Sequence, residues 1–293
     1  MISIIITAYR EPSTIGHAIG AFLAQLPANS EILVVCPDAE TTAVVNDYAN
    51  KYPNIRHIQD RQKGKPAAIN LGLAAAKGDI IVLSDGDVQI SQNALPHLLA
   101  PFANSQVGAV TGQPISASPR TTMLGYWSHL LVNAAHQVRQ KRYNQGDFLL
   151  CSGYLFACRK ALLPPIPEDA LAEDAVISHR IAEQGYKIAY APDAKVYVKY
   201  PTTYADWLRQ KVRSAGGYAQ DHVRLSPVQM RSARREMTEG PRLALAFAQT
   251  PREFLWTLLL FGARLHLWLL VFWRVRVQKR PLSQLWQRVE TTK

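Results

Sequence analysis

The stretch GKPAAINLGLAAAKGDIIVLSDGDVQI, residues 64–90, places a helical pattern, an apolar run and an acidic turn in immediate succession. Pro66–Lys77 has the pattern of a helix closed by Gly78, and Ile80–Ser84 that of a buried strand. A strand that is apolar on both faces is typical of a parallel sheet covered by helices. A helix that leads directly into such a strand is part of a β–α–β unit. This stretch therefore predicts an α/β fold.

The same alternation extends to both sides of this stretch. The predicted strands are Ile2–Ile6, Glu31–Cys36, Ile55–Gln59, Val107–Gln113 and Phe156–Arg159, and the predicted helices begin at Pro12 or cover Thr41–Lys51, Gln92–Phe102, Thr121–Lys141 and Glu173–Gln184. We expect a mostly parallel central sheet flanked by helices over residues 1–203. Open α/β sheets bind ligands at the carboxyl ends of their strands, so the residues that follow each strand are the candidates for chemistry.

The positive charge of the chain is confined to its last third. The net charge is +11, but residues 1–206 hold 17 Lys and Arg against 17 Asp and Glu, whereas residues 207–293 hold 16 against 5. A basic end on a neutral body indicates contact with a polyanion, either anionic lipid headgroups or nucleic acid. The three cysteines form no C-x-x-C pair, and the N-terminus has no basic flank, so we expect a cytosolic protein without a secretory signal.

Residues 253–293 differ in kind from the rest, and residues 204–252 form a basic helical region before them. Phe254–Trp273 is apolar, ends in aromatic residues and is followed by the basic run RVRVQKR. This is the length and flanking of a membrane span. Arg264 and His266 interrupt the segment and lie about 200° apart around a helix, so they form no single polar face. Three alternatives stay open: a spanning or re-entrant helix, attachment at the membrane surface, and a buried core helix.

Asp85 and Asp87 project to the same side of an extended chain, roughly 6–7 Å apart. Their charges repel by about 2.5 kcal/mol at an effective dielectric constant of 20. A divalent cation, Mg²⁺ or Mn²⁺, reverses the sign of this energy, since it binds one or two carboxylates together with water and phosphate oxygens. Gly86 leaves room for a ligand, and Gln89 offers a further oxygen. The alternative interpretation is a polar turn after a strand.

The other strand ends carry side chains suited to a nucleotide. Asp38 is placed to accept hydrogen bonds from a base or ribose, and Lys63 and Lys65 stand beside a helix N-terminus, where phosphate charge is stabilised. Their alternatives are a helix cap for Asp38 and solvated loop positions for the two lysines. The candidates that follow the first strand are Thr7, Tyr9 and Glu11.

Two later stretches add an acidic pair and a basic cluster. Glu173 and Asp174 begin a helix, where a carboxylate acts either as a dipole-stabilising cap or as a general base. Gln210 and Arg213 belong to a basic cluster that would neutralise a departing diphosphate, or else form a plain basic surface. His222, which follows this cluster, is a further candidate metal ligand.

Taken in order, these stretches resemble the family 2 glycosyltransferases. The opening strand with TAYREP resembles the family's first motif, residues 64–90 resemble its run into the D-x-D, SGYLFACRKAL resembles the segment before the acceptor side, and AEDAVISHRIAEQGYKIAYAP resembles its E-D motif. The resemblance covers roughly residues 1–215. It implies the Rossmann-like GT-A fold, here with a C-terminal helical, membrane-associated segment.

The resemblance also implies roles for individual residues. Nucleotide contacts fall on Thr7, Tyr9, Glu11, Asp38, Lys65 and Asp85, the metal on Asp87 with help from Asp85 and Gln89, and the catalytic base on Asp174. Processive members of the family carry Q-x-x-R-W, whereas here Ser214 stands at the tryptophan position after Gln210 and Arg213. This departure argues against a polymer synthase.

The sequence thus indicates an inverting, metal-dependent transfer of one sugar from a nucleotide diphosphate donor to a lipid-linked or glycan acceptor at the cytosolic membrane face. The alternatives are a nucleotidyltransferase, which releases pyrophosphate, and a basic membrane- or nucleic-acid-binding adaptor without activity. The apolar segment around Arg264 is unlike an exposed basic surface, so we expect no nucleic-acid partner.

Overall fold

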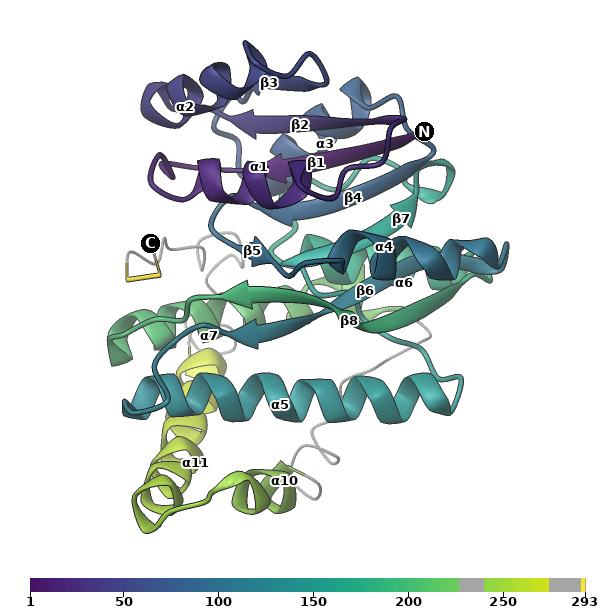
Figure 1. The fold of residues 1–293 in the computed structure, drawn as a ribbon. Coiled ribbons are helices and arrows are strands. Elements are labelled where there is room, and N and C mark those ends of the chain that lie inside the picture. The colour runs from purple at the N-terminus through teal and green to yellow at the C-terminus, as the bar shows by residue number, and fades with distance from the viewer. Residues whose placement is uncertain (227–239, 274–290, 293) are drawn as a thin grey trace.

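The structure is a computed structural model that describes residues 1–226, 240–273 and 291–292 (Figure 1). The strands are β1 (Ile2–Thr7), β2 (Ser30–Cys36), β3 (Ile55–Gln59), β4 (Ile80–Asp85), β5 (Gln89–Ile90), β6 (Val107–Ser116), β7 (Leu155–Arg159) and β8 (Lys187–Val198). The helices are α1 (Ile15–Leu23), α2 (Ala39–Ala49), α3 (Lys65–Ala75), α4 (Ala94–Leu99), α5 (Met123–Asn144), α6 (Glu173–Glu183), α7 (Tyr204–Ala219), α8 (Asp221–Arg224), α10 (Gly240–Phe247) and α11 (Pro251–Phe272).

The eight strands form one sheet in the order β3-β2-β1-β4-β7-β6-β8-β5. The first four strands in this order are parallel, as expected from their apolar sequences, and β6 and β8 are parallel as well. β7 is antiparallel to both of its neighbours, β4 and β6, and β5 is antiparallel to β8. The sheet is therefore mixed, and its parallel half is the part that the helix–strand alternation predicted.

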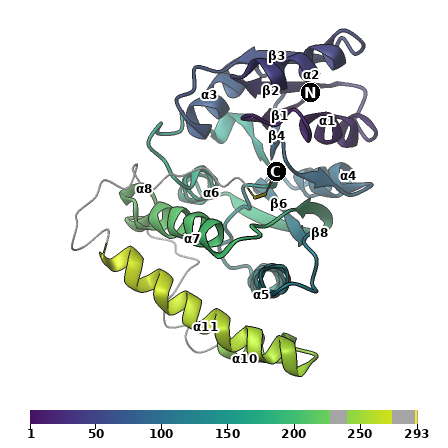
Figure 2. The ribbon, with the colours of Figure 1, turned by 90° about the vertical axis from the view of Figure 1, so that its left-hand side faces the viewer.

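Helices cover both faces of the sheet, as Figure 2 shows for α1 and α4 on one side and α3 and α6 on the other. Successive side chains of a strand point to opposite faces, so β1 contributes Ile4 and Ile6 to one core and Ile5 to the other. The first core includes Phe22 of α1, and the second includes Ile69 of α3. Burial on both sides explains why β1 and β4 contain continuous apolar runs.

A further helical layer lies beyond the edge of the sheet that holds β6 and β8. α5 packs against α11, and α11 packs against α7. Trp127 of α5 meets Trp207 of α7 at 5.3 Å between ring centroids, within a core that also contains Leu260 of α11. These helices are packed onto the rest of the domain, and the division of the chain near residues 203 and 252 stays a prediction.

Candidate active site

The carboxyl ends of β1 and β4 meet because the two strands are parallel neighbours in register, with Thr7 opposite Asp85. The Thr7 hydroxyl donates to Oδ1 of Asp85 at 3.3 Å, and the amide of Gly86 donates to the carbonyl of Thr7 at 2.9 Å. A Cβ atom at Gly86 would lie 2.6 Å from Oε2 of Glu11. Glycine therefore lets the acidic turn close against the loop that follows β1.

Lys65 joins this turn to the second acidic pair. Its Nζ lies 2.6 Å from Oδ1 of Asp85 and 2.9 Å from Oε1 of Glu173. Burial by itself would lower the pKa of Lys65, but the charges of the two carboxylates raise it well above its ordinary value. Lys65 is the first residue of α3 after Gly64, whose φ of 99° favours glycine. The lysine is thus fixed between β4 and the N-terminus of α6, rather than solvated.

Asp87 is the carboxylate of the turn that Lys65 does not contact directly. Burial, followed by the negative charge of Asp85, raises its pKa to about 6, while Lys65 and Arg213 act in the opposite direction. Within the described residues no group of three His, Cys, Asp or Glu side chains gathers at one point. The two carboxylates of the turn fit Mg²⁺ or Mn²⁺ only when water and substrate phosphates complete the coordination, which is the usual arrangement for Mg²⁺.

Asp174 lies at the start of α6 and faces the loop before β7. Its Oδ2 accepts from the amide of Gly153 at 3.0 Å, and its Oδ1 accepts from the amide of Ala175 at 2.9 Å. Burial and then the charge of Glu173 raise the pKa of Asp174 to about 6, against a smaller opposing effect of Lys65. A carboxyl with such a pKa is ionised near neutral pH and retains some basicity, as a general base requires.

Asp38 acts as a helix cap. Its Oδ1 accepts from the amide and the hydroxyl of Thr41, and its Oδ2 accepts from the amide of Arg10 at 2.7 Å. Burial would raise the pKa of Asp38, but these hydrogen bonds bring it below its ordinary value. The amide of Glu11 donates to the Thr41 hydroxyl, so the cap also holds the loop after β1 in place. These contacts are those of a helix cap, which was the alternative interpretation of Asp38 from the sequence. Its contact with a nucleotide stays a prediction.

Three further candidates, Arg213, Gln210 and Tyr9, are wholly or partly buried. Arg213 is half-buried in α7, where its charge acts on both Asp87 and Glu173, and Oε1 of Gln210 is buried with no hydrogen-bond partner among the described residues. Tyr9 is half-buried beneath the guanidinium of Arg10.

Two candidates are less central than the sequence predicted. Lys63 is exposed, and its Nζ lies 4.0 Å from the exposed carboxylate of Glu168. Gln89 is exposed in β5, where its backbone pairs with Tyr197, and within the described part of the chain no contact joins it to Asp85 or Asp87. The side chain of His222 lies outside the described residues.

The sequence did not single out Tyr154, which lies near the acidic turn, or Tyr200, which packs against Tyr154. The carbonyl of Tyr154 accepts from the hydroxyl of Ser84 at 3.0 Å, and its ring lies edge-on to Tyr200 at 6.4 Å. Burial raises the pKa of Tyr154 to about 12, with Arg213 opposing and Asp85 and Asp87 adding to the rise. The stretch SGYL was noted only for its resemblance, and the nearness of this ring to Asp87 depends on the antiparallel pairing of β7 with β4.

Residues 1–217 match the family described as "Glycosyltransferase like family 2". The chain belongs to this family. It is 28% identical over 229 residues to "Probable glycosyltransferase YdaM" of Bacillus subtilis (strain 168), a match that covers 74% of this chain and 54% of the relative. It is 25% identical over 223 residues to "Poly-beta-1,6-N-acetyl-D-glucosamine synthase" of Staphylococcus aureus (strain COL), again covering 74% of this chain and 54% of the relative. The chain thus spans about half the length of these family 2 relatives.

The fold agrees with this membership. The structure of S. aureus TarS residues 1–349 superposes with a TM-score of 0.51 and 18% sequence identity, covering 85% of this chain and 73% of that one. The α/β fold that residues 64–90 predicted is therefore the fold that this chain shares with the TarS structure.

Proposed function

We propose that this chain transfers a single sugar, with inversion, from a nucleotide diphosphate donor to a lipid-linked acceptor at the cytosolic membrane face. The observation that carries the proposal is the convergence of three elements on Lys65, which ion-pairs Asp85 at the end of β4 and Glu173 at the start of α6. In an open α/β sheet this edge is where a nucleotide binds. The relatives named as glycosyltransferase and polysaccharide synthase support the sugar-transfer chemistry.

Each residue has a distinct part in the proposed reaction. Asp174 takes the proton of an acceptor hydroxyl as that oxygen attacks the anomeric carbon from the face opposite the diphosphate. Arg213 and Lys65 stabilise the negative charge that grows on the leaving diphosphate. An acceptor that is already a phosphate anion needs no proton removed, so the requirement for Asp174 distinguishes hydroxyl from phosphate acceptors.

Asp87, assisted by Asp85, would hold Mg²⁺ or Mn²⁺ at the diphosphate, and Gln89 would have to turn toward them to contribute. The bound ion supplies charge neutralisation for the departing nucleoside diphosphate. Thr7, Tyr9, Glu11, Asp38 and Lys63 are the proposed nucleotide contacts around it. Ser214, at the position where processive members carry tryptophan, supports transfer of one sugar rather than synthesis of a polymer.

The test is to screen nucleotide diphosphate sugars for Mn²⁺-dependent binding by calorimetry, and then to add lipid acceptors to the vesicle-reconstituted protein. We expect one donor to bind and to yield a nucleoside diphosphate with a glycosylated lipid. Release of pyrophosphate when a nucleoside triphosphate and a sugar phosphate are offered in place of the donor would instead identify a nucleotidyltransferase. Absence of binding of any donor sugar under all metal conditions, together with no release of pyrophosphate, would leave only the adaptor alternative.

A further inference from the structure

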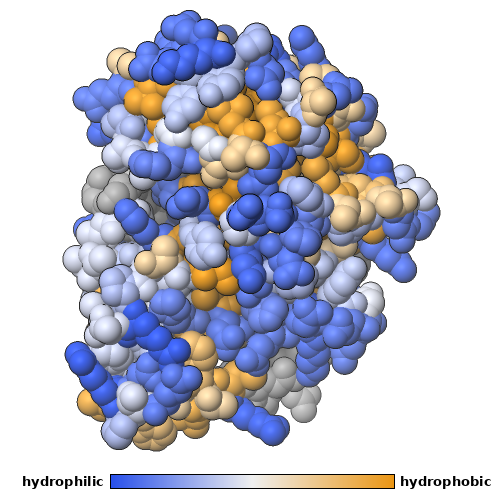
Figure 3. All heavy atoms as spheres, in the orientation of Figure 1, coloured by the Kyte–Doolittle hydropathy of each residue, from blue (hydrophilic) through white to orange (hydrophobic). Residues whose placement is uncertain are grey.

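The outer face of α11 is apolar except at exposed His266, whose Nδ1 lies 2.9 Å from the hydroxyl of Tyr204. Nine large hydrophobic side chains of α11 and its C-cap are between 45% and 62% exposed: Phe254, Leu255, Leu258, Leu259, Leu265, Trp268, Leu269, Phe272 and Trp273. Figure 3 shows hydrophobic residues gathered at the lower end of the molecule, where α10 and α11 lie in Figure 1. A continuous apolar patch of this kind is unusual on a monomeric soluble protein and marks an interaction surface.

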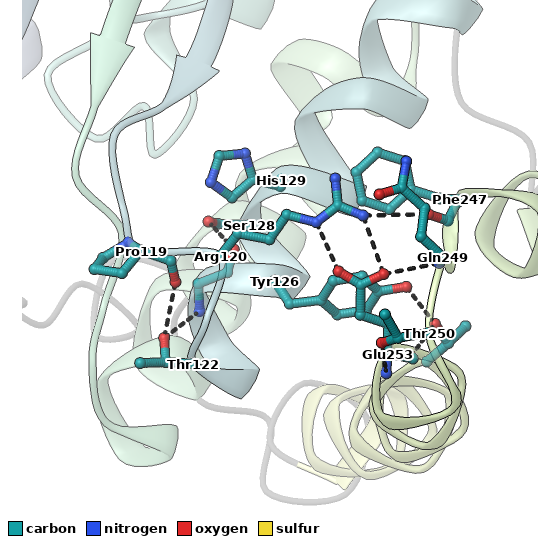
Figure 4. A network of polar contacts seen from close by, with 12 residues as sticks. Pro119, Arg120, Thr122, Tyr126, Ser128, His129, Phe247, Gln249, Thr250 and Glu253 are labelled. Atoms are coloured by element: carbon teal, nitrogen blue, oxygen red, sulfur yellow. Dashed lines mark hydrogen bonds and ion pairs between the residues drawn. The ribbon is translucent and has the colours of Figure 1, made fainter.

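The inner face of the same helix is attached to the domain by polar contacts (Figure 4). Arg120 donates to Glu253 through Nε at 2.7 Å and through Nη2 at 3.1 Å, and these bonds hold the pKa of Glu253 below its ordinary value. The Thr257 hydroxyl is 2.7 Å from that of Tyr126, and the indole of Trp127 donates to the carbonyl of Trp256. The buried residues Glu253, Thr257, Leu260, Ala263 and Leu267 recur every three or four positions, so they form one stripe.

The packing of α11 onto the domain favours one of the three alternatives that the sequence left open, namely that α11 binds at the membrane surface. α11 meets the length and hydropathy of a membrane span, but only 28% of its most apolar window is buried, so it is not a core helix. A spanning helix would have to carry the neighbouring α5 and α7 into the hydrocarbon with it. Exposed Gln137 of α5 and Arg209 of α7 make that unfavourable. Arg264 lies between Leu260 and Leu267 on the inner stripe and is half-buried, so this charge does not interrupt the outer face.

We propose that the outer face of α11 lies flat on an anionic lipid bilayer, with the helix axis in the plane of the interface. The apolar side chains would enter the boundary between headgroups and acyl chains, roughly 5–10 Å deep. Exposed Arg242 and Arg252 stand at the end of the surface that α10 adjoins, and Arg274, Arg276, Lys279 and Arg280 follow α11 in the sequence. This positive charge matches acidic headgroups and makes lipid, rather than a second copy of the chain, the occupant.

The surface is connected to the active site through α7. Val212 of α7 packs against Leu267 of α11, and the Tyr204 hydroxyl lies 2.9 Å from Nδ1 of His266. The next residue of α7, Arg213, acts on Asp87 and Glu173. α7 thus packs against the helix that carries the proposed lipid surface, and it also carries Arg213, whose charge affects the proposed diphosphate site. The inference deepens the membrane location of the proposed function, but it rests on no part of the transfer chemistry.

The first experiment is flotation of the full chain with vesicles of phosphatidylcholine alone or mixed with phosphatidylglycerol. We expect binding to the anionic vesicles, and a loss of about tenfold or more in the variant Leu258→Gln/Leu265→Gln/Leu269→Gln, since ~1.4 kcal/mol of partition free energy is a factor of ten. The matched control places three glutamines at exposed apolar positions elsewhere, Tyr52→Gln/Tyr143→Gln/Leu225→Gln, and should bind as the wild type does.

The second experiment measures depth with an environment-sensitive fluorophore on single cysteines introduced at Leu255, Leu258, Leu265 or Leu269. The native cysteines Cys36, Cys151 and Cys158 are buried, so labelling in the folded state is selective. If the helix lies in the interface, the fluorophore should report a similar, shallow depth at all four positions. A profile that is deepest at mid-helix would show a span and overturn the proposal.

Two further outcomes would also overturn it. One is vesicle binding by the glutamine triple variant that is as tight as that of the wild type. The other is a wild-type dimer, seen by sedimentation without lipid, that the triple variant abolishes while vesicles fail to bind. Circular dichroism establishes that each variant is folded. Metal-dependent donor binding, measured in parallel, should be equal in wild type and triple variant, which separates failure of the docking proposal from failure of the proposed function.

Discussion

The two acidic pairs of this molecule, Asp85 with Asp87 and Glu173 with Asp174, come from different elements but have the same electrostatic arrangement. In each pair one carboxylate forms a short ion pair with Lys65, at 2.6 Å for Asp85 and 2.9 Å for Glu173. In each pair the other carboxyl has a pKa raised to about 6, first by burial and then by the charge of its neighbour. A single lysine therefore holds one member of each pair, and the member with the raised pKa is the one that Lys65 does not pair with.

Lys65 lets four carboxylates share one site, because its positive charge offsets part of their mutual repulsion. Two adjacent carboxylates that share one site push their pKa values apart, and the member with the raised pKa is the one suited to acid–base work or to a cation. By this rule Asp174 is the base and Asp87 the metal ligand, whereas Asp85 and Glu173 position them. The assignment is a hypothesis that substitutions at these residues can test.

The largest effect is expected for Asp174→Asn, which removes the base but keeps the shape of the side chain. We expect transfer to a hydroxyl acceptor to fall by about 10²–10⁴-fold, with donor binding retained, because general-base catalysis contributes about that much. The measurement is single-turnover transfer, with binding of the donor in the presence of Mn²⁺ as the second readout. Glu168→Gln, at an exposed carboxylate, is the matched control. Unchanged turnover in the Asp174→Asn variant would remove Asp174 from the mechanism.

Lys65→Met breaks both ion pairs at once. The positive charge of Lys65 lowers the pKa of both Asp87 and Asp174, so its loss should raise both. We expect transfer at pH 7 to fall by roughly 10²-fold, since removal of one electrostatic stabiliser of developing charge typically costs 10²–10³-fold. Lys51→Met changes an exposed lysine just after α2, to which no part of the site is assigned, and should have little effect. Equal losses in the two variants would mean that neither ion pair matters for positioning.

The pH dependence gives a smaller effect that reports protonation of the two carboxyls with raised pKa, Asp87 and Asp174. Asp174 must be deprotonated to act as a base, so single-turnover transfer should decrease as the pH falls through about 6, by about tenfold per pH unit below the pKa. In Lys65→Met this acid limb should move to higher pH, because the opposing positive charge is gone. In Lys51→Met it should stay in place. A limb that does not move in Lys65→Met would contradict the arrangement of the two pairs.

Much of the fold followed from local sequence patterns, and the parts that did not depend on long-range pairing. Ile55–Gln59 was predicted with the bounds that β3 has, and Pro66–Lys77 differs from α3 by one or two residues at its ends. The reversed direction of β7 carries no local signal, because an apolar strand has the same sequence pattern in either direction. The mixed half of the sheet was therefore the part that the alternation rule missed.

The candidate site divides in the same way. The strand that leads into the acidic turn and the helix that begins at Glu173 are local features, and both were predicted. The ion pair between Lys65 and Glu173 joins residues far apart in the sequence, so the sequence suggested a phosphate-binding lysine but not its carboxylate partners. Likewise, the sequence does not show which side of α11 is buried. The contacts of Arg120 with Glu253 and of Tyr126 with Thr257 identify that side in the structure. In the sequence alone Arg264 interrupts an apolar segment. In the structure Arg264 lies beside the buried residues Leu260 and Leu267, on the side of α11 that faces the domain.

The smallest effect is expected at Asp38, which belongs to neither pair and whose two oxygens already accept hydrogen bonds from Thr41 and Arg10. Asp38→Ala should lower the free energy of unfolding by about 1 kcal/mol, the usual cost of losing an N-cap, as measured by urea denaturation. Asp38→Asn keeps a capping oxygen and should lose less. If Asp38 also binds the nucleotide, both variants should weaken donor binding beyond this change in stability. If Asp38→Asn binds the donor as tightly as the wild type does, the role of Asp38 is limited to holding the loop after β1. The negative charge of the site would then come from the two acidic pairs that Lys65 joins.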